Sequence, residues 1–235
     1  MRSKIDTIGF DADDTLWHNE RFFRLTQDRF TELLSDHCAP DRLDERLLAA
    51  ERRNLSLYGF GIKGFTLSMI ETAVEVTGGK VPGEVIAALL AAGREMLAHP
   101  IDLLPHARDA VEQIAGTHRV VLITKGDLLD QERKLAASGL AEYFSAIEIV
   151  SDKNQATYAR IFAQHTDGAD HTVMVGNSLR SDILPALAAG SYAVYVPHDL
   201  TWSYEHADEP LGQPRYARIA HLGALPEAIA RLQSP

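Results

Sequence analysis

Short runs of apolar and often β-branched residues recur along the chain and predict strands. They lie at residues 7–10, 120–123, 147–150, 172–175 and 192–196. From the second run onward they recur about every 20 to 30 residues, with amphipathic helical stretches between them. These stretches cover residues 107–115, 128–137, 156–164 and 183–189. The alternation predicts an α/β fold, a Rossmann-like doubly wound parallel sheet with helices on both faces.

Glycines follow three of the predicted helices. Gly116, Gly139 and Gly190 stand where a C-terminal helix cap needs a residue that tolerates positive φ. We therefore expect a left-handed glycine at each of these helix ends.

The interval between the first and second runs is longer than a simple crossover needs. About a hundred residues intervene, whereas a parallel connection takes roughly a dozen or more. Within this interval, apolar residues recur at helical spacing in four stretches, 20–36, 40–57, 65–76 and 82–99. We predict an inserted, all-helical domain over residues 17–102 and a main domain formed by residues 1–16 and 103–235.

Composition and charge limit the partners that the chain can have. Its 235 residues are 46% hydrophobic and 24% charged, which is typical of a globular chain with one sizeable core and a smaller second domain. The formal net charge of -10 repels nucleic acid polymers and anionic membranes, so neither is an expected partner. A phosphorylated ligand would also be repelled unless a cation or a local basic group received it.

The sequence shows no pattern of export or membrane insertion. Cys38 is the single cysteine, which excludes a disulfide framework within the chain and fits a reducing compartment. No apolar run approaches the roughly 20 residues that cross a bilayer, and the first residues lack a signal-peptide pattern. We therefore expect a soluble, cytoplasmic protein.

Chemically active residues follow four of the predicted strands. The sequence reads DADDT at 11–15, TKGD at 124–127, SDK at 151–153 and GNSLRSD at 176–182. Ligands of an open parallel sheet bind beyond the carboxyl ends of its strands. The predicted fold therefore brings carboxylates, a hydroxyl, an ammonium and a glycine-led turn to one edge of the sheet.

In order and spacing, these four segments resemble the four motifs of the haloacid dehalogenase-like hydrolase superfamily. The most specific is Asp11-x-Asp13-x-Thr15 after an apolar strand, and the match covers nearly the whole main domain. The resemblance implies that the insert after the first motif is a helical cap. Residues 126–144 are also similar to the branch of the superfamily that holds many small-molecule phosphatases and nucleotidases.

The chemistry of phosphate monoester hydrolysis fits these residues. It needs an in-line nucleophile, a proton donor for the leaving oxygen and positive charge on the transferring group. Asp11 can attack phosphorus to give an aspartyl-phosphate. Asp13 can protonate the leaving alcohol and then deprotonate the water that cleaves the intermediate. We therefore predict Asp11 and Asp13 as the catalytic pair.

The resemblance also implies which groups hold the metal and the phosphate. Mg2+ prefers hard oxygen ligands and usually keeps some waters. The implied metal ligands are the carboxylate of Asp11, the backbone carbonyl of Asp13, Asn177 and Asp182. The implied phosphate-binding residues are Thr124, Lys125 and Lys153. The lysine at 153 would also restrain the crowded carboxylates, and metal and lysine together would overcome the repulsion that the net charge creates.

Position 177 departs from the pattern of the family. Many members have an aspartate there that binds the metal directly, whereas Asn177 offers a neutral amide oxygen. This removes one negative charge from the metal shell. Mg2+ would then bind more weakly, or Asp182 would take over the coordination.

Four residues are candidates for substrate contact. Trp17 and His18 follow the first motif directly and could line the cavity. Tyr58 and Lys63 belong to the glycine-rich stretch 58–64, which could be mobile and bring either side chain over the site. A simple turn between two helices explains the same glycines equally well.

Several other polar residues favour a structural interpretation. Asp14 stands where the family commonly has glycine and is expected to be a turn residue, and Asp127 is expected to be a solvated loop charge. His198, Trp202 and His206 recur at helical spacing, which resembles a zinc pair only superficially and favours an edge helix.

Together these observations favour a magnesium-dependent phosphatase that acts on a small phosphorylated metabolite beneath a helical cap. Two alternatives stay open. A haloacid dehalogenase uses the same nucleophilic carboxylate but needs neither a metal nor an acid, and Asp13 argues against it. A phospholigand-binding protein without turnover is the other alternative, and Asn177 is the feature that favours it.

Overall fold

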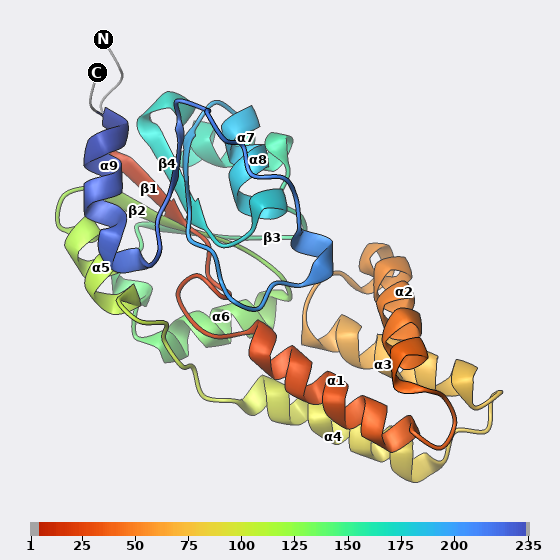
Figure 1. Ribbon diagram of the computed structural model, residues 1–235. Coiled ribbons are helices and arrows are strands. Elements are labelled where there is room, and N and C mark those ends of the chain that lie inside the picture. The colour runs from red at the N-terminus through yellow and green to blue at the C-terminus, as the bar shows by residue number, and fades with distance from the viewer. Residues whose placement is uncertain (1–4, 234–235) are drawn as a thin grey trace. The chain divides into compact units, whose positions relative to one another are not determined.

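A parallel sheet of six strands, in the order β3-β2-β1-β4-β5-β6, forms the centre of one unit (Figure 1). This computed structural model describes residues 5–233, so the outermost residues of the predicted main domain, 1–4 and 234–235, lie outside it. The strands are β1 (Thr7–Phe10), β2 (Arg119–Lys125), β3 (Ala146–Val150), β4 (Thr172–Gly176), β5 (Tyr192–Tyr195) and β6 (Tyr216–Arg218). The chain builds from β1 toward β3 at one edge and then returns to add β4, β5 and β6 on the other side. The carboxyl ends of β1 and β4 therefore border the crevice where such sheets bind ligands.

Helices cover both faces of the sheet because successive side chains of a strand point to opposite faces. On β2, Val120 and Leu122 belong to one core, and Val121 and Ile123 belong to the other. The helices of this unit are α5 (Ala107–Ala115), α6 (Leu128–Ser138), α7 (Gln155–His165), α8 (Leu184–Ala188) and α9 (Leu225–Gln233). Helices α5 and α9 pack on the first face, and α7 and α8 pack on the second (Figure 1). The predicted α/β, Rossmann-like fold is confirmed.

The chain divides into two compact units, one containing the residues up to Glu20 and those from Ile101 onward, the other Arg21–Pro100. The second unit is built from helices α1 (Glu20–Leu34), α2 (Pro40–Tyr58), α3 (Ile62–Val76) and α4 (Gly83–Ala98). The four helices share one hydrophobic core, which is separate from the cores of the sheet unit and includes the buried side chains Phe30, Leu47, Met69 and Leu89. None of the described helices is both long and apolar enough to cross a bilayer.

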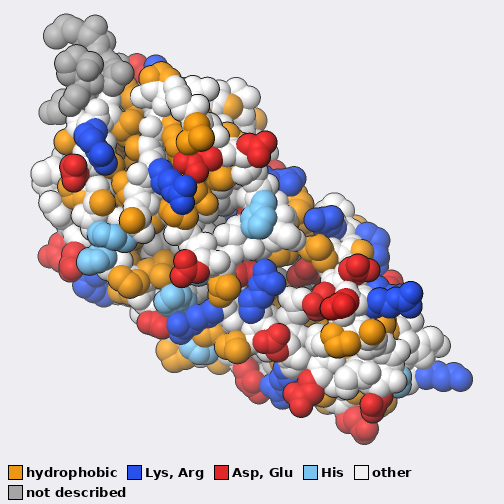
Figure 2. Space-filling view, viewed as in Figure 1, with side chains coloured by type: hydrophobic (Ala, Val, Ile, Leu, Met, Phe, Trp, Pro, Cys, Tyr) orange, Lys and Arg blue, Asp and Glu red, His pale blue; other side chains and the backbone are white. Residues whose placement is uncertain are grey.

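Acidic and basic side chains are interspersed on the face of the molecule shown in Figure 2. This face therefore has no large patch of one sign, although the chain carries a net charge of -10.

The turn between α2 and α3 is tighter than the sequence predicts. Gly59 and Gly61 have φ of 72° and 112°, and α3 begins directly afterwards at Ile62. Gly64 lies inside this helix, where a Cβ atom would be 2.8 Å from the carbonyl oxygen of Gly59. The stretch 58–64, for which a mobile segment and a simple turn between helices were both open, is a glycine turn followed by a helix that includes Lys63, and its mobility stays a prediction.

The predicted glycine caps are confirmed at two of three positions. Gly139 and Gly190 have φ of 66° and 97°. Gly116 has φ of -67°, so the prediction is wrong there. The backbone N–H of His118 still bonds to the carbonyl of Ile114 at 2.9 Å, so the chain leaves α5 in right-handed geometry and needs no left-handed residue.

The segment after β5 does not form the predicted edge helix. Within residues 198–206 only Ser203–Glu205 forms a short 3₁₀ turn. The ring of His198 bonds to the backbone of Leu200, and such local bonds compete with a helix. The sequence prediction also missed β6, which has only three residues.

Candidate active site

A buried ammonium group lies between two buried carboxylates at the carboxyl ends of the strands. Lys153, in the loop after β3, places its Nζ 2.5 Å from Asp11 Oδ1 and 2.7 Å from Asp182 Oδ1. Asp11 follows β1 directly, and Asp182 belongs to the π-helical turn Leu179–Ile183 after β4. The structure thus brings together three of the predicted site residues from segments that are far apart in the sequence.

Burial and neighbouring charges shift the proton equilibria of this group. Burial raises the pKa of Asp11 to about 7, the Asp182 carboxylate adds to the shift, and Lys153 opposes it. Burial alone would lower the pKa of Lys153, but the two carboxylates raise it well above its ordinary value. Lys153 is therefore charged at neutral pH. A divalent cation beside Asp11 would favour the ionised carboxylate.

Oxygen atoms meet at the second carboxylate oxygen of Asp11. One polar atom of the Asn177 amide lies 3.2 Å from Asp11 Oδ2 and 3.2 Å from the backbone oxygen of Asp13. Thr15 Oγ1 donates to Asp11 Oδ2 at 2.9 Å. An amide nitrogen could donate to these two oxygens, or an amide oxygen could share a cation with them. Asp11 Oδ2 and the Asp13 carbonyl oxygen thus lie at one point, joined by the Asn177 oxygen in the second orientation, and such hard oxygens fit Mg2+; the two oxygens of Asp182 are bonded to Lys153 and to the backbone of Ser178, respectively.

Replacing Asn177 by aspartate is expected to tighten Mg2+ binding about tenfold or more, because it adds a full negative charge to this group of oxygens. The measurement is calorimetric titration of the chelator-treated protein with Mg2+, with Asn154→Asp as a matched control in the exposed loop after β3. An unchanged Mg2+ affinity in Asn177→Asp would contradict a ligand role for position 177.

Asp182 is held in place by a close approach of the backbone. Its Oδ2 accepts from the backbone N–H of Ser178 at 2.9 Å, and its side chain packs directly over Gly176. A Cβ atom at position 176 would overlap the Asp182 carboxylate. The glycine that ends β4 is therefore a requirement of the site and not only of the turn.

Gly176→Ala is expected to displace the Asp182 carboxylate from Lys153, to weaken Mg2+ binding, and to destabilise the protein by roughly 1–3 kcal/mol through overpacking. Denaturant unfolding and Mg2+ titration measure the two effects. Gly83→Ala is the control, since a Cβ there meets no atom within 4 Å. Equal stability and Mg2+ affinity in both variants would contradict the prediction.

Asp13 is surrounded by hydrogen-bond donors. Trp17 Nε1 donates to Oδ1 at 2.7 Å, and Gln131 Nε2 donates to Oδ2 at 3.2 Å. Lys134 Nζ lies 3.0 Å from Oδ1 and 3.2 Å from Oδ2. Gln131 also donates to Thr124 Oγ1 at 2.5 Å. This network fixes the position of the Asp13 carboxyl group.

Sequence reasoning assigned no role to Gln131 and Lys134, although a signal was present. Asp127 caps α6, since its Oδ1 accepts from the backbone N–H of Asp130 at 3.1 Å, and it is not the solvated loop charge predicted. Positions 127, 131 and 134 are four and three residues apart, so they share one face of a helix that begins at the end of β2. Asp152, in the loop after β3, is exposed.

Lys125 turns to a different partner from the one predicted. Its Nζ lies 2.7 Å from Glu205 Oε1 and 2.9 Å from Ser181 Oγ. Burial works against ionisation of Glu205, but Lys125 and the hydroxyls of Ser178 and Ser181 hold the pKa of Glu205 below its ordinary value. Lys125 therefore joins the turn after β4 to the 3₁₀ turn of Ser203–Glu205, and a contact with phosphate stays a prediction.

The four predicted substrate residues fall into the two units. Trp17 is buried and faces Asp13 with its indole N–H, so it contacts the site through that carboxylate. His18 is half-buried in the same unit. Tyr58 ends α2 and Lys63 lies in the first turn of α3, and both are exposed in the helical unit. Their contact with substrate stays a prediction.

Asp14 is more than a turn residue. It has φ of 59°, and its carboxylate accepts from the backbone N–H groups of Asn19 at 2.8 Å and Glu20 at 2.9 Å, so it caps the start of α1. Burial raises its pKa to about 6, against the effect of these bonds and of His198. The short polar side chain of an aspartate tolerates this positive φ, and its carboxylate bonds the backbone at the start of α1.

Comparison with known proteins decides the family. A model of the haloacid dehalogenase-like hydrolase family matches residues 5–190. The chain belongs to this family. A haloacid dehalogenase-like family hydrolase from Xanthomonas campestris is 39% identical, with 97% of this chain and 96% of that chain covered and a TM-score of 0.88. No curated protein matched in a sequence search.

More distant structures share the fold and are named for different reactions. A 2-haloacid dehalogenase from Pseudomonas syringae is 21% identical, with 97% of this chain and 99% of that chain covered and a TM-score of 0.62. A predicted phosphoglycolate phosphatase from Haemophilus somnus is 15% identical, with 96% of this chain and 98% of that chain covered and a TM-score of 0.63. Membership in the family therefore makes the chain a hydrolase, and the bond that it cleaves must be argued from its own residues.

Proposed function

We propose that the chain is a magnesium-dependent phosphatase that hydrolyses a small phosphorylated metabolite through an aspartyl-phosphate on Asp11. The observation that carries the proposal is the donor network around Asp13. Dehalogenation releases a halide and needs no acid, whereas an alcohol leaving from phosphorus does. A second carboxylate two residues after the nucleophile, held by Trp17, Gln131 and Lys134, suits that proton transfer.

In the first step an oxygen of Asp11 attacks phosphorus, and the bond from phosphorus to the leaving oxygen breaks. Asp13 gives its proton to that oxygen, and Lys134 and Trp17 stabilise the carboxylate that remains. When bound by Asp11, Asp182, Asn177 and the Asp13 carbonyl, Mg2+ would supply positive charge that lets the phosphate approach two carboxylates. Lys153 would supply a second positive charge from the other side of Asp11.

In the second step water attacks the phosphorus of the aspartyl-phosphate. Asp13 takes the proton of that water, the bond between phosphorus and Asp11 breaks, and inorganic phosphate leaves. Thr124 accepts from Gln131, an arrangement that directs its own hydroxyl proton to another acceptor, such as a phosphoryl oxygen. Each residue returns to its starting protonation state.

The helical unit is proposed as the cap that selects the metabolite. Its exposed Tyr58 and Lys63 carry a phenol and an ammonium, groups that bind the polar parts of small metabolites. A ligand with one phosphate and a small polar body suits these groups better than a polymer does.

The test is release of nitrophenol from p-nitrophenyl phosphate by the wild type and by Asp11→Asn, with and without Mg2+. We expect metal-dependent release and a loss of roughly 10⁴-fold or more in the variant. Asp152→Asn, which changes an exposed carboxylate beside Lys153, is the control and should retain activity. Metal-independent chloride release from 2-chloropropionate would indicate a dehalogenase. Tight binding of vanadate without turnover would indicate a phospholigand-binding protein.

A further inference from the structure

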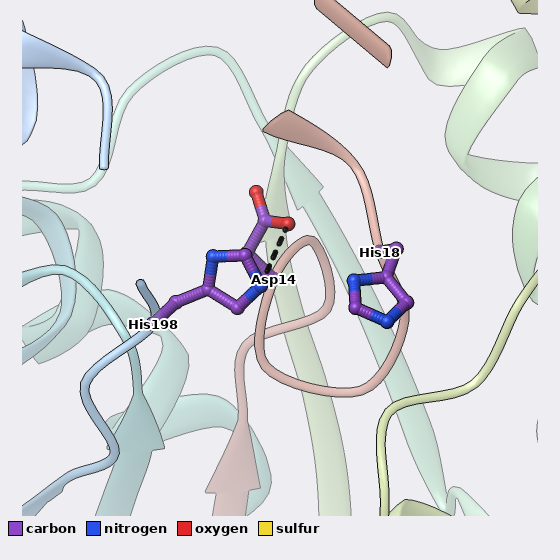
Figure 3. A group of neighbouring side chains, drawn as sticks. All are labelled: Asp14, His18 and His198. Atoms are coloured by element: carbon purple, nitrogen blue, oxygen red, sulfur yellow. Dashed lines mark ion pairs between the residues drawn. The ribbon is translucent and has the colours of Figure 1, made fainter. Parts of the chain in front are cut away.

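A second group of metal-ligating side chains lies in the sheet unit, outside the residues proposed for hydrolysis. Asp14 and His18 come from the segment after β1, and His198 comes from the segment after β5 (Figure 3). One ligating atom from each lies within 4.8 Å of the others. Figure 3 shows both imidazole rings beside the Asp14 carboxylate.

His198 is oriented as a metal ligand usually is. Its Nδ1 lies 2.8 Å from the carbonyl oxygen of Leu200, and the backbone N–H of the same residue points to Nδ1 at 3.2 Å. The first contact suits a proton on Nδ1 and the second suits a lone pair there; with the proton on Nδ1, the lone pair lies on Nε2. A backbone carbonyl that accepts from Nδ1 is the typical support of a ligating histidine.

The distance between His198 and Asp14 is too long for a hydrogen bond. His198 Nε2 lies 3.7 Å from Asp14 Oδ1, and the two side chains are only 11% and 7% exposed. With the proton on Nδ1, a nitrogen lone pair therefore faces a carboxylate oxygen across a gap that is too long for direct bonding. A cation between the two atoms stabilises such a pair of acceptors; without a cation, a proton on Nε2 would do so.

Asp14 and His18 place their ligating atoms close to that of His198. Backbone N–H groups of Asn19 and Glu20 fix the Asp14 carboxylate, and each of its oxygens keeps further lone-pair capacity. The ring of His18 lies 5.8 Å from that of His198, at an interplanar angle of 68°. Two imidazoles and a carboxylate with their ligating atoms this close form a common donor set for zinc-type ions.

We propose that Asp14, His18 and His198 bind a divalent transition-metal ion of the zinc class, separately from the Mg2+ held at Asp11 and Asp182. Imidazole nitrogen selects such an ion over Mg2+, which prefers oxygen. Three protein ligands leave a position for water. The ion would connect the segment that follows Asp13 to the segment after β5, so its binding stabilises the folded chain.

The test is titration of chelator-treated protein with Co2+ in excess Mg2+ at neutral pH, followed by visible absorption. We expect one Co2+ per chain, with ligand-field bands of a site with histidine ligands, displaced by Zn2+, and a higher melting temperature. His198→Gln and His18→Gln should each weaken binding at least tenfold. His206→Gln, which changes an exposed histidine eight residues later, and Asp11→Asn should bind Co2+ as the wild type does.

Two results would overturn the proposal. One is the absence of Co2+ binding to the wild type once Mg2+ is in excess, with NMR of the ring nitrogens showing a proton on Nε2 of His198, since an interaction of that proton with Asp14 would then explain the cluster. The other is equal Co2+ affinity in the wild type, His198→Gln and His18→Gln. Paramagnetic shifts of the His18 and His198 signals in the wild type answer the question even where a variant does not fold.

Discussion

In Asp13→Asn, hydrolysis of an alkyl phosphomonoester is expected to fall roughly 10²- to 10⁴-fold, because no group protonates the leaving oxygen. With p-nitrophenyl phosphate the result should differ. Nitrophenolate leaves without a proton, so the aspartyl-phosphate still forms on Asp11, but asparagine cannot activate the water that cleaves it. A burst of about one nitrophenol per active site, followed by a slow steady state, is the expected signature.

Rapid-mixing absorbance with p-nitrophenyl phosphate measures the burst. Phosphate release from glycerol phosphate measures the loss of hydrolysis of the alkyl ester. Lys134 keeps Asp130 as a partner, at 3.5 Å, so the variant should remain folded. Asp152→Asn is the control for loss of a carboxylate near the site. Equal losses with both esters and no burst would show that Asp13 does not transfer protons.

The free energy of unfolding of the metal-free protein is expected to fall as pH rises from about 4 to 7. Burial raises the pKa of Asp11 from its ordinary 3.8 to about 7. Between these values the folded chain holds a proton that the unfolded chain has released, so unfolding releases protons and becomes easier as pH rises. A shift of about three units corresponds to a loss of up to roughly 4 kcal/mol.

Urea unfolding at several pH values, with and without Mg2+, measures this dependence. Asp11→Asn should flatten most of the slope, and the raised pKa of Asp14, about 6, should leave a smaller slope of the same sign. Mg2+ should restore stability at neutral pH, because it favours the ionised Asp11. A stability that rises across this pH range, or an unchanged slope in Asp11→Asn, would contradict the buried-carboxylate description.

The sequence predicted the sheet and the meeting of its strand ends for a simple physical reason. Buried parallel strands are continuous apolar runs, and their carboxyl ends share one edge. Asp11, Lys153 and Asp182 therefore come into contact once the strand order is right. The fifth strand was also predicted, but β6 was not, because three residues contain too little of the alternating pattern.

Interactions that depend on side-chain direction were harder to predict. Lys125 and Lys153 both follow strands, and only the structure shows that the first turns to Glu205 and the second to Asp11. The contact between Asp14 and His198 joins two irregular segments, for which no periodicity exists to read. The place of Gln131 in the site could have been predicted, since its position on α6 follows from the cap at Asp127.

Trapping the covalent intermediate tests the phosphatase proposal most directly. Asp13→Asn would be mixed with p-nitrophenyl phosphate and Mg2+, quenched in acid and digested, and its peptides would be analysed by mass spectrometry. The proposal predicts one phosphoryl group on Asp11, formed at the rate of the nitrophenol burst and absent in Asp11→Asn. Nitrophenol release without phosphorylation of Asp11, or with the phosphoryl group on another residue, would contradict it.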